Sequence, residues 1–239
     1  GGKVRRLLRA SIAALSITLA AVGMPMAANE AHAVEHPTYS HHPWPDASKD
    51  FKTKGVFTTP NNRTITVHQG ATIRSGSGGT CSITLIGDRI GYTAEHCSHG
   101  RWTRGTEIFD QSNHRIGRVA AMSRGLDAVK IDLDPSVRVD GRWEKRDYNS
   151  LNVGEPVHVL GLGQRFNESR VTDRPLMGWN GRPNTVALVS PLNSRPGTSG
   201  GAMVDRYNRV IGINVGYLEN YTGKYGAYIP WNVVDSELR

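Results

Sequence analysis

From about Asn61 onward, the chain consists of short apolar segments separated by turn residues, and this region contains no long amphipathic helix. Cys81–Ile86 and Arg89–Thr93 flank the turn signal Gly87-Asp88, which predicts a β-hairpin. Further strands are predicted at Thr64–Val67, Ala128–Leu133, Val157–Leu160, Val186–Val189, Val210–Val215 and Ala227–Ile229. About a dozen short strands without crossover helices predict an all-β protein, built as a pair of closed barrels or as a sandwich. Trp231–Leu238 is expected to form a short terminal helix.

The first 33 residues have a different pattern from the rest. Four basic residues come first, namely Lys3, Arg5, Arg6 and Arg9. Ala10–Val22 is apolar and uncharged, and Ala31-His32-Ala33 places small residues where a signal peptidase cuts. This order predicts a secretory signal peptide over residues 1–33 and a secreted protein with no membrane contact after cleavage. An uncleaved membrane anchor is the alternative, because the uncharged stretch is nearly long enough to span a bilayer.

Residues 34–60 are rich in His, Pro, Ser, Thr and Lys, as in His41-His42-Pro43-Trp44-Pro45. This composition predicts a propeptide or a flexible N-terminal arm. A metal-binding exported protein that uses this His-rich arm is an alternative function. Residues 61–239 then form the folded domain.

The formal net charge of the chain is +8, of which the signal segment contributes four basic residues and one acid. About +5 therefore remains on the mature chain. Its basic residues are scattered, for example Arg101, Arg104, Arg115, Arg118 and Arg124. They do not alternate with aromatic residues as on a nucleic-acid-binding surface, so no nucleic-acid partner is expected.

The two cysteines, Cys81 and Cys97, are expected to form a disulfide, because export implies an oxidising compartment. A bond closing a loop of about 15 residues is worth roughly 3 kcal/mol in the chain-entropy model. A metal site built from Cys81, His96, Cys97 and His99 is the alternative. Its spacing matches no common zinc pattern, so neither a metal nor another cofactor is expected.

Gly197-Thr198-Ser199-Gly200-Gly201 surrounds a serine with small and flexible residues. A serine that attacks a carbonyl needs a base for its proton and N–H groups for the developing oxyanion. In α/β-hydrolases the acid and the histidine follow the serine. No histidine follows Ser199, so that order is excluded. The order that remains is a histidine, then an aspartate, then Ser199.

Three segments resemble those of the trypsin/chymotrypsin-like serine proteases. Thr93–Cys97 is similar to the family's Thr-Ala-x-His-Cys segment, Leu126–Ile131 to its Asp and following strand, and Pro196–Gly201 to its Gly-Asp-Ser-Gly-Gly segment. Val210–Gly216 resembles the strand that lines the substrate cleft. The resemblance spans most of the chain after about residue 64. It implies two packed six-stranded antiparallel β-barrels with the active site between them and a short C-terminal helix.

The resemblance implies a secreted serine endopeptidase that acts through an acyl-enzyme, as a monomer on protein or peptide substrates. His96 is then the base, Asp127 orients it, and the N–H groups of Gly197 and Ser199 form the oxyanion hole. Asp127 has three rivals, namely Asp132, Asp134 and Asp140. It is preferred because an apolar strand follows it directly. A non-catalytic binding homologue and an esterase with the same triad are the alternatives.

By analogy, the primary specificity pocket involves Asn193, Ser194, Asn214 and Gly216. Neither Asn193 nor Ser194 is acidic, so a preference for a neutral or apolar side chain is expected rather than one for Arg or Lys.

Thr198 stands where the animal digestive enzymes have the Asp that pairs with a newly cut N-terminus. Activation by insertion of an N-terminus is therefore not expected. The segment up to about residue 60 is expected to be trimmed without a direct link to the active site. These features resemble bacterial secreted members, including the glutamyl endopeptidase-like group.

Overall fold

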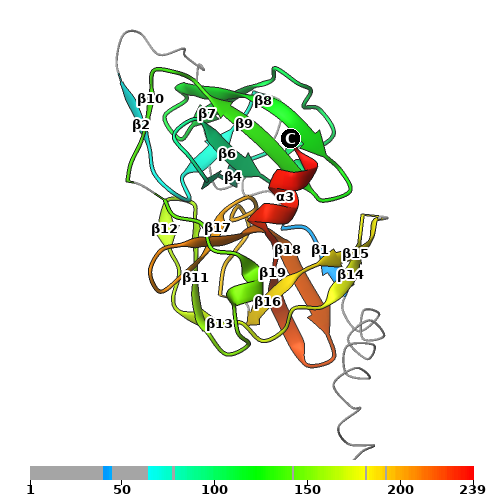
Figure 1. Ribbon diagram of the computed structural model, residues 1–239. Coiled ribbons are helices and arrows are strands. Elements are labelled where there is room, and N and C mark those ends of the chain that lie inside the picture. The colour runs from blue at the N-terminus through cyan, green and yellow to red at the C-terminus, as the bar shows by residue number, and fades with distance from the viewer. Residues whose placement is uncertain (1–39, 45–63, 77–78, 142, 181, 192) are drawn as a thin grey trace, which may run out of the picture.

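A computed structural model describes residues 40–44, 64–76, 79–141, 143–180, 182–191 and 193–239 (Figure 1). The expected signal peptide, and most of the expected propeptide or arm, lie outside the described residues. Within them the protein is mainly β-structure with one short C-terminal α-helix, as predicted. None of the helices among the described residues is long and apolar enough to cross a membrane.

The first barrel is formed by the N-terminal half of the described chain. Its strands are β3 (Thr72–Arg74), β4 (Cys81–Ser82), β5 (Thr84–Leu85), β6 (Ile90–Thr93), β7 (Glu107–Asp110), β8 (Arg115–Ser123) and β9 (Ala128–Leu133). They pair in the order β4-β3-β7-β8-β9-β6-β5. Because only Ile83 separates β4 from β5, the two ends of this order meet in one interrupted strand, and six strands close the sheet. β2 (Ile65–Val67) and β10 (Val137–Val139) form a separate parallel pair.

The second barrel follows in the C-terminal half. Its strands are β11 (Pro156–Gly161), β12 (Gln164–Arg165), β13 (Ser169–Arg170), β16 (Leu188–Pro191), β17 (Ala202–Asp205), β18 (Val210–Asn220) and β19 (Gly223–Pro230). They pair in the order β12-β11-β17-β18-β19-β16, and β13 also pairs with β11. A bridge between Asp173 and Val189 joins the segment after β13 to β16, so the edges of this sheet also meet. β14 (Leu176–Trp179) and β15 (Arg182–Val186) form a separate hairpin.

The alternation of side chains explains how these strands enclose their cores. In β9, Val129, Ile131 and Leu133 are buried in the core of the first barrel, whereas Asp132 is exposed. In β18, by contrast, residues 210–216 are all buried. The first part of the strand lies between β17 and β19 and is covered on both faces, as its nearly continuous apolar sequence requires, whereas residues 217–219 pair with β19 on one side only within this barrel.

The C-terminal helix α3 (Trp231–Glu237) connects the two barrels. It continues from β19 of the second barrel, and Figure 1 shows it in red where the two barrels meet. The Tyr92 hydroxyl of the first barrel donates a hydrogen bond to Asp235 of this helix at 2.8 Å, and burial raises the pKa of Tyr92. Tyr92 and Leu126 also share a hydrophobic cluster with Ile213 of β18. The barrels therefore pack as one body.

The predicted hairpin is confirmed, because Thr84 pairs with Tyr92 and Leu85 with Gly91. The single strand predicted at Val186–Val189 is wrong, since β15 ends at Val186 and β16 begins at Leu188. The apolar run there belongs to two strands that the buried Ala187 separates and that pair with different partners, β14 and β19.

β8 was not predicted, although it is a long strand. Two arginines lie on it, and a shift in its pairing with β9 between Val119 and Ala121 interrupts the alternation of buried and exposed residues.

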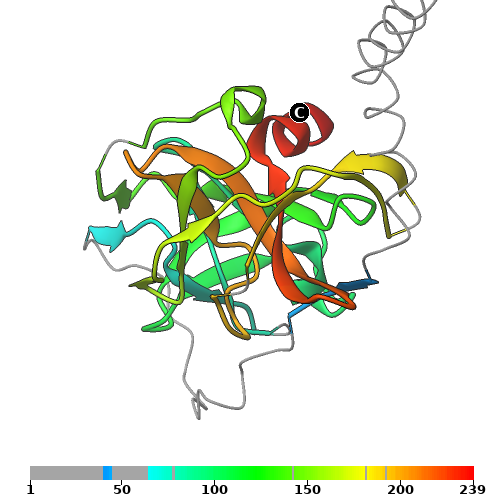
Figure 2. The ribbon, with the colours of Figure 1, turned by 90° about the horizontal axis from the view of Figure 1, so that it is seen from below.

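The described part of the N-terminal segment forms β1 (Ser40–His42), which pairs antiparallel with β18. Figure 2, viewed from below, shows this strand in blue beside the hairpin of β18 and β19. Residues that we placed in a flexible arm therefore extend the sheet of the second barrel.

Candidate active site

His96, Asp127 and Ser199 meet between the two barrels. His96 Nδ1 lies 2.7 Å from Asp127 Oδ2, and His96 Nε2 lies 2.8 Å from Ser199 Oγ. The backbone N–H of His96 also donates to Asp127 Oδ1 at 2.8 Å. Asp127 and Ser199 are each only 1% exposed. One imidazole thus contacts both a carboxylate and a hydroxyl that are shielded from water.

The first barrel brings His96 and Asp127 together through strand pairing. Thr93, the last residue of β6, pairs with Val129 near the start of β9. His96 lies on the 3₁₀ turn Glu95–Ser98 just after β6, and Asp127 immediately precedes β9. Asp127 has a positive φ of 54°, a conformation that Asp tolerates better than most residues.

The three rival aspartates lie elsewhere. Asp132 is exposed on β9, Asp134 pairs with Arg115 at 2.8 Å, and Asp140 pairs with His68 at 2.7 Å.

Ser199 belongs to a loop of residues 195–201, called here the Ser199 loop, that contacts the first barrel through its backbone. The Ser82 N–H donates to the Ser199 carbonyl at 2.8 Å, and the Thr84 hydroxyl donates to the Gly200 carbonyl at 2.7 Å. Gly200 has a φ of 86°, and a Cβ there would lie 2.1 Å from Thr93 Oγ1. Only glycine fits this position, which explains the Ser-Gly sequence.

Two N–H groups of the Ser199 loop remain available to a ligand. Within the part of the chain that the structure describes, the N–H groups of Gly197 and Ser199 donate to no protein acceptor. The Ser82 hydroxyl donates to the Gly197 carbonyl at 2.9 Å. This hydrogen bond fixes the position of the carbonyl group of Gly197. Two free donors beside a hydroxyl are suited to stabilise a negatively charged oxygen.

The four residues expected in the specificity pocket have different surroundings. The Asn193 side chain donates to the carbonyl of Asn167, and Ser194 is half-buried. The Asn214 amide accepts from the Gly216 N–H at 3.0 Å and donates to Thr198 at 3.5 Å. Asn214 therefore links the Ser199 loop to β18 rather than presenting a free amide.

Two hydroxyl groups of this region were not predicted from the sequence. Tyr228 and Ser190 are fully buried, and among the described residues neither hydroxyl has a hydrogen-bond partner. Both Ser190 and Ser194 lie close enough to Tyr228 to act on its pKa. Burial raises the pKa of Tyr228 to about 12. Ser190 faces Gly226 on β19, and the missing side chain of Gly226 makes room for the Tyr228 ring. This register is set by tertiary pairing, and no sequence motif marks it.

Cys81 and Cys97 form the predicted disulfide. The bond leaves no thiolate for the alternative metal site. Across the described ranges, no group of three or more His, Cys, Asp or Glu side chains is arranged to hold a metal ion.

The N-terminal segment reaches this site. Trp44 is 8% exposed and, with His96 and Ser199, lines a cavity of about 20 Å³ beside the disulfide. We expected this part of the chain to have no direct link to the active site, and for Ser40–Trp44 that expectation is wrong. The extended segment pairs with backbone groups of β18 that would otherwise be unpaired. The composition of the segment does not indicate this pairing.

No family model matches the chain, and neither does any curated protein. Solved structures with the same fold are numerous. Chymotrypsin of Cellulomonas bogoriensis is 20% identical with a TM-score of 0.53, and the match covers 72% of this chain and 96% of that one. A glutamic acid-specific serine protease, described as using a histidine triad in substrate binding, is 20% identical with a TM-score of 0.55 over 72% and 97%. The MamO protease domain of Magnetospirillum magneticum is 17% identical with a TM-score of 0.54 over 71% and 96%. The chain therefore has the chymotrypsin-like fold of bacterial serine proteases.

Proposed function

We propose that this protein is a secreted serine endopeptidase that hydrolyses protein or peptide substrates through an acyl-enzyme. The observation that carries the proposal is the position of one imidazole. His96 contacts the Ser199 hydroxyl at 2.8 Å and the Asp127 carboxylate at 2.7 Å. A serine hydroxyl becomes an effective nucleophile when an adjacent base takes its proton. This arrangement supplies that base.

The reaction follows from these contacts. Ser199 Oγ bonds to the scissile carbonyl carbon while His96 Nε2 takes its proton, and the Gly197 and Ser199 N–H groups stabilise the oxyanion. The C–N bond then breaks as His96 gives the proton to the leaving amine. Water attacks the resulting ester and gives a proton to His96, and the acid product leaves as Ser199 regains its proton. Asp127 stays ionised and holds Nδ1 as a donor. These steps need no metal or other cofactor.

We assign the pocket a preference for a neutral or apolar side chain. Its expected residues, Asn193, Ser194, Asn214 and Gly216, carry no charge. The buried Tyr228 and Ser190 add hydroxyl groups only. Cleavage sites in a denatured proteome test this assignment, because cuts clustered after Arg or Lys, or confined to Glu, would contradict it.

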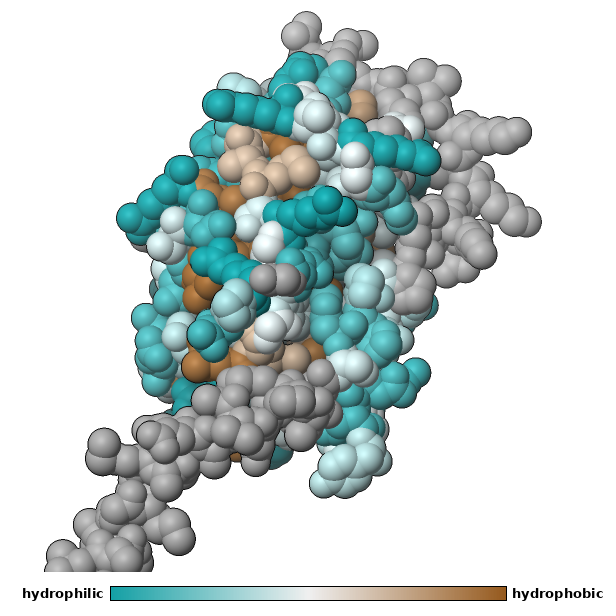
Figure 3. All heavy atoms as spheres, turned by 90° about the vertical axis from the view of Figure 1, so that its right-hand side faces the viewer, coloured by the Kyte–Doolittle hydropathy of each residue, from teal (hydrophilic) through white to brown (hydrophobic). Residues whose placement is uncertain are grey.

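The proposal includes export of the chain. Residues 1–33 are then the signal peptide, residues 34–60 the propeptide and residues 61–239 the protease domain. We propose that the mature enzyme is a monomer without membrane or nucleic-acid partners. On the face in Figure 3, hydrophilic side chains divide the apolar surface into separate patches.

A non-catalytic binding homologue and an esterase remain the competing functions. The first has no need for a hydroxyl held 2.8 Å from an imidazole. The second shares the acyl-transfer chemistry, and a comparison of peptide and simple ester substrates separates the two.

Labelling with a fluorophosphonate tests the proposed function directly. We expect one label per chain at Ser199 and none in Ser199→Ala. Asp127→Asn should lower kcat about 1,000- to 10,000-fold with little change in KM, because the imidazole loses its orienting carboxylate. His158→Ala is the control, since His158 contacts the Phe166 carbonyl outside the site. Labelling that persists in Ser199→Ala would contradict the proposal.

A further inference from the structure

The segment Ser40–Trp44 lies along β18 as an extended peptide lies along a sheet edge. Ser40, His41 and His42 pair antiparallel with Glu219, Leu218 and Tyr217. The Ser40 hydroxyl donates to the Glu219 carbonyl at 3.3 Å. Main-chain pairing of this kind is how proteins bind extended peptides. The segment therefore occupies the edge of the strand that runs past Asn214 toward Ser199.

Gly216 lets the segment approach the backbone of β18. A Cβ at this position would lie 2.2 Å from the His42 carbonyl oxygen and 3.0 Å from Pro43 Cα. The φ of Gly216 is 137°, which also favours glycine. The sequence also favours an extended segment. His42 precedes Pro43 and Trp44 precedes Pro45, and a residue before proline prefers an extended backbone. A segment that is already extended loses little conformational entropy on docking.

Two side chains of the segment enter sites of different chemistry. The His41 imidazole lies against the Trp179 ring with 3.6 Å between the ring centres, and its Nε2 lies 3.3 Å from the Val215 carbonyl oxygen. Burial lowers the pKa of His41 to about 4, so the docked imidazole is neutral. Trp44 is buried with its ring centre 5.1 Å from that of Tyr217, and it lines the same cavity as the Cys81–Cys97 disulfide, His96 and Ser199.

Trp44 leaves little space beside Ser199. The remaining cavity of about 20 Å³ holds about one water molecule. Under the proposed function, a peptide substrate pairs with β18, which resembles the strand that lines the substrate cleft, and takes the space beside Ser199. Substrate and segment would then exclude each other.

We propose that Ser40–Trp44 is an intramolecular ligand of the substrate groove, which it closes until the segment is displaced. The proposal rests on the proposed function and names two subsites. One is the face of Trp179, which takes a flat neutral ring. The other lies against the disulfide and takes a large aromatic side chain. Peptides with an aromatic or imidazole residue at these positions are the ligands that this groove fits.

The first test uses the full chain with the double substitution His41→Ala and Trp44→Ala. Only the fraction of molecules with an open groove binds substrate, so displacing the segment raises apparent affinity. We expect at least about 10-fold faster fluorophosphonate labelling of Ser199 and a KM lowered by a similar factor, with kcat unchanged. The control His114→Ala and Tyr207→Ala removes one imidazole and one aromatic ring from the surface, and it should change neither value. Trp44→Ala alone should give an intermediate effect.

The second test adds the segment back in trans. A synthetic peptide with the sequence of residues 39–45 should inhibit the double variant competitively, whereas a scrambled peptide should not. Equal labelling of all variants together with no inhibition by the peptide would overturn the inference and leave the proposed function intact. If the double variant and Trp44→Ala both lost their cooperative unfolding transition, the segment would be a structural part of the fold and the inference would be wrong.

Failure of the proposed function gives a different result. Neither the wild type nor the double variant would then be labelled. Calorimetry of the same peptide with the double variant would still measure binding to the groove, and absence of binding there would overturn the inference.

Discussion

At the scale of single residues, the half-buried imidazole of His41 makes the proposed docking of the segment depend on pH. Its pKa falls to about 4 because burial opposes the charged form. Three titratable groups act on it electrostatically. Asp127 raises this pKa, whereas His96 and His42 lower it. The docked segment thus favours neutral His41, while the free segment has an imidazole with an ordinary pKa near 6.5.

This difference in pKa predicts release of the segment by acid. Docking is fully favoured above pH 6.5 and loses up to about 3 kcal/mol as the pH falls toward 4, because only the free imidazole takes up a proton in this range. The emission spectrum of Trp44 is obtained by subtracting the spectrum of the double variant Ser199→Ala, Trp44→Phe from that of Ser199→Ala. This spectrum should shift to that of an exposed Trp as the pH falls from 6.5 toward 4. His41→Gln should remove the shift. A Trp44 signal that is unchanged between pH 7 and pH 4.5 would contradict the prediction.

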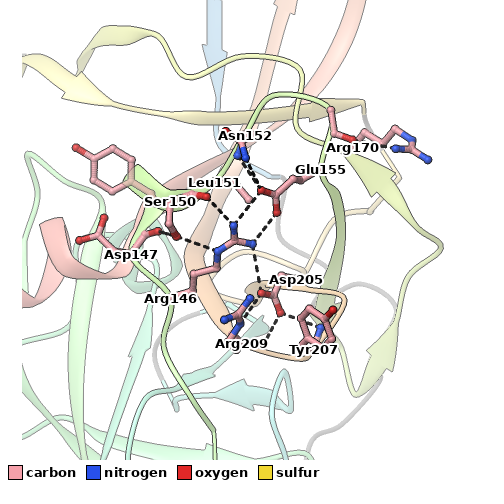
Figure 4. Close-up of polar contacts among 12 residues, drawn as sticks. Arg146, Asp147, Ser150, Leu151, Asn152, Glu155, Arg170, Asp205, Tyr207 and Arg209 are labelled. Atoms are coloured by element: carbon pink, nitrogen blue, oxygen red, sulfur yellow. Dashed lines mark hydrogen bonds and ion pairs between the residues drawn. The ribbon is translucent and has the colours of Figure 1, made fainter.

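At the scale of elements, Arg146 attaches the connection between the barrels to the second barrel (Figure 4). Its guanidinium donates to Glu155 at 2.6 and 2.9 Å and to Asp205 at 3.4 Å. Asp205, which is 1% exposed, also accepts from Arg209 in the turn between β17 and β18 at 2.7 Å. A connecting segment with little regular structure is thereby fixed by charge-assisted hydrogen bonds rather than by strand pairing.

The Arg146 contacts predict a loss of stability in acid. The hydrogen bond from Arg146 lowers the pKa of Glu155 from 4.5 to about 2. This carboxylate therefore stabilises the fold above pH 4.5, and its contribution disappears as the pH falls from 4.5 to 2. Glu155→Gln should lower the free energy of unfolding at pH 7 by about 2 kcal/mol, allowing for partial exposure. Urea unfolding should show the gap between wild type and variant closing by pH 2. The exposed Glu168→Gln is the control, and an equal loss there would contradict the prediction.

At the scale of the whole molecule, the geometry of the candidate active site depends on contacts between the barrels. Ser82 of the first barrel is fully buried, donates to the Gly197 carbonyl at 2.9 Å and accepts from the Leu162 N–H at 2.8 Å. Both partners belong to the second barrel or its loops. Ser82 therefore fixes the position of Ser199 relative to His96.

Ser82→Ala should reduce both stability and catalysis. Leaving a buried carbonyl and N–H without partners costs about 2 kcal/mol in the free energy of unfolding. Displacement of Gly197 should lower kcat about 10-fold, since loss of an oxyanion donor costs up to about 1,000-fold. Ser150→Ala removes two hydrogen bonds away from the Ser199 loop, at 3.0 and 2.7 Å, and should leave kcat unchanged. An unchanged kcat in Ser82→Ala would show that the loop holds its shape without this contact.

The sequence by itself determined the class of fold, the hairpin before His96 and which three residues meet in the candidate site. These features depend on local signals, namely alternating apolar residues, turn residues and short motifs in a fixed order. Asp127 was separated from its rivals because it directly precedes a strand. Even so, neither its positive φ nor its second bond to the His96 N–H has a sequence signal.

Only the tertiary structure decided which distant groups lie beside these residues. Strand register placed Ser190 and Tyr228 near Ser194, and no local pattern encodes pairing between strands far apart in the chain. The position of Ser40–Trp44 has the same cause. Its composition is that of an exposed arm, whereas a free strand edge and an aromatic face that exist only in the folded protein determine where it lies.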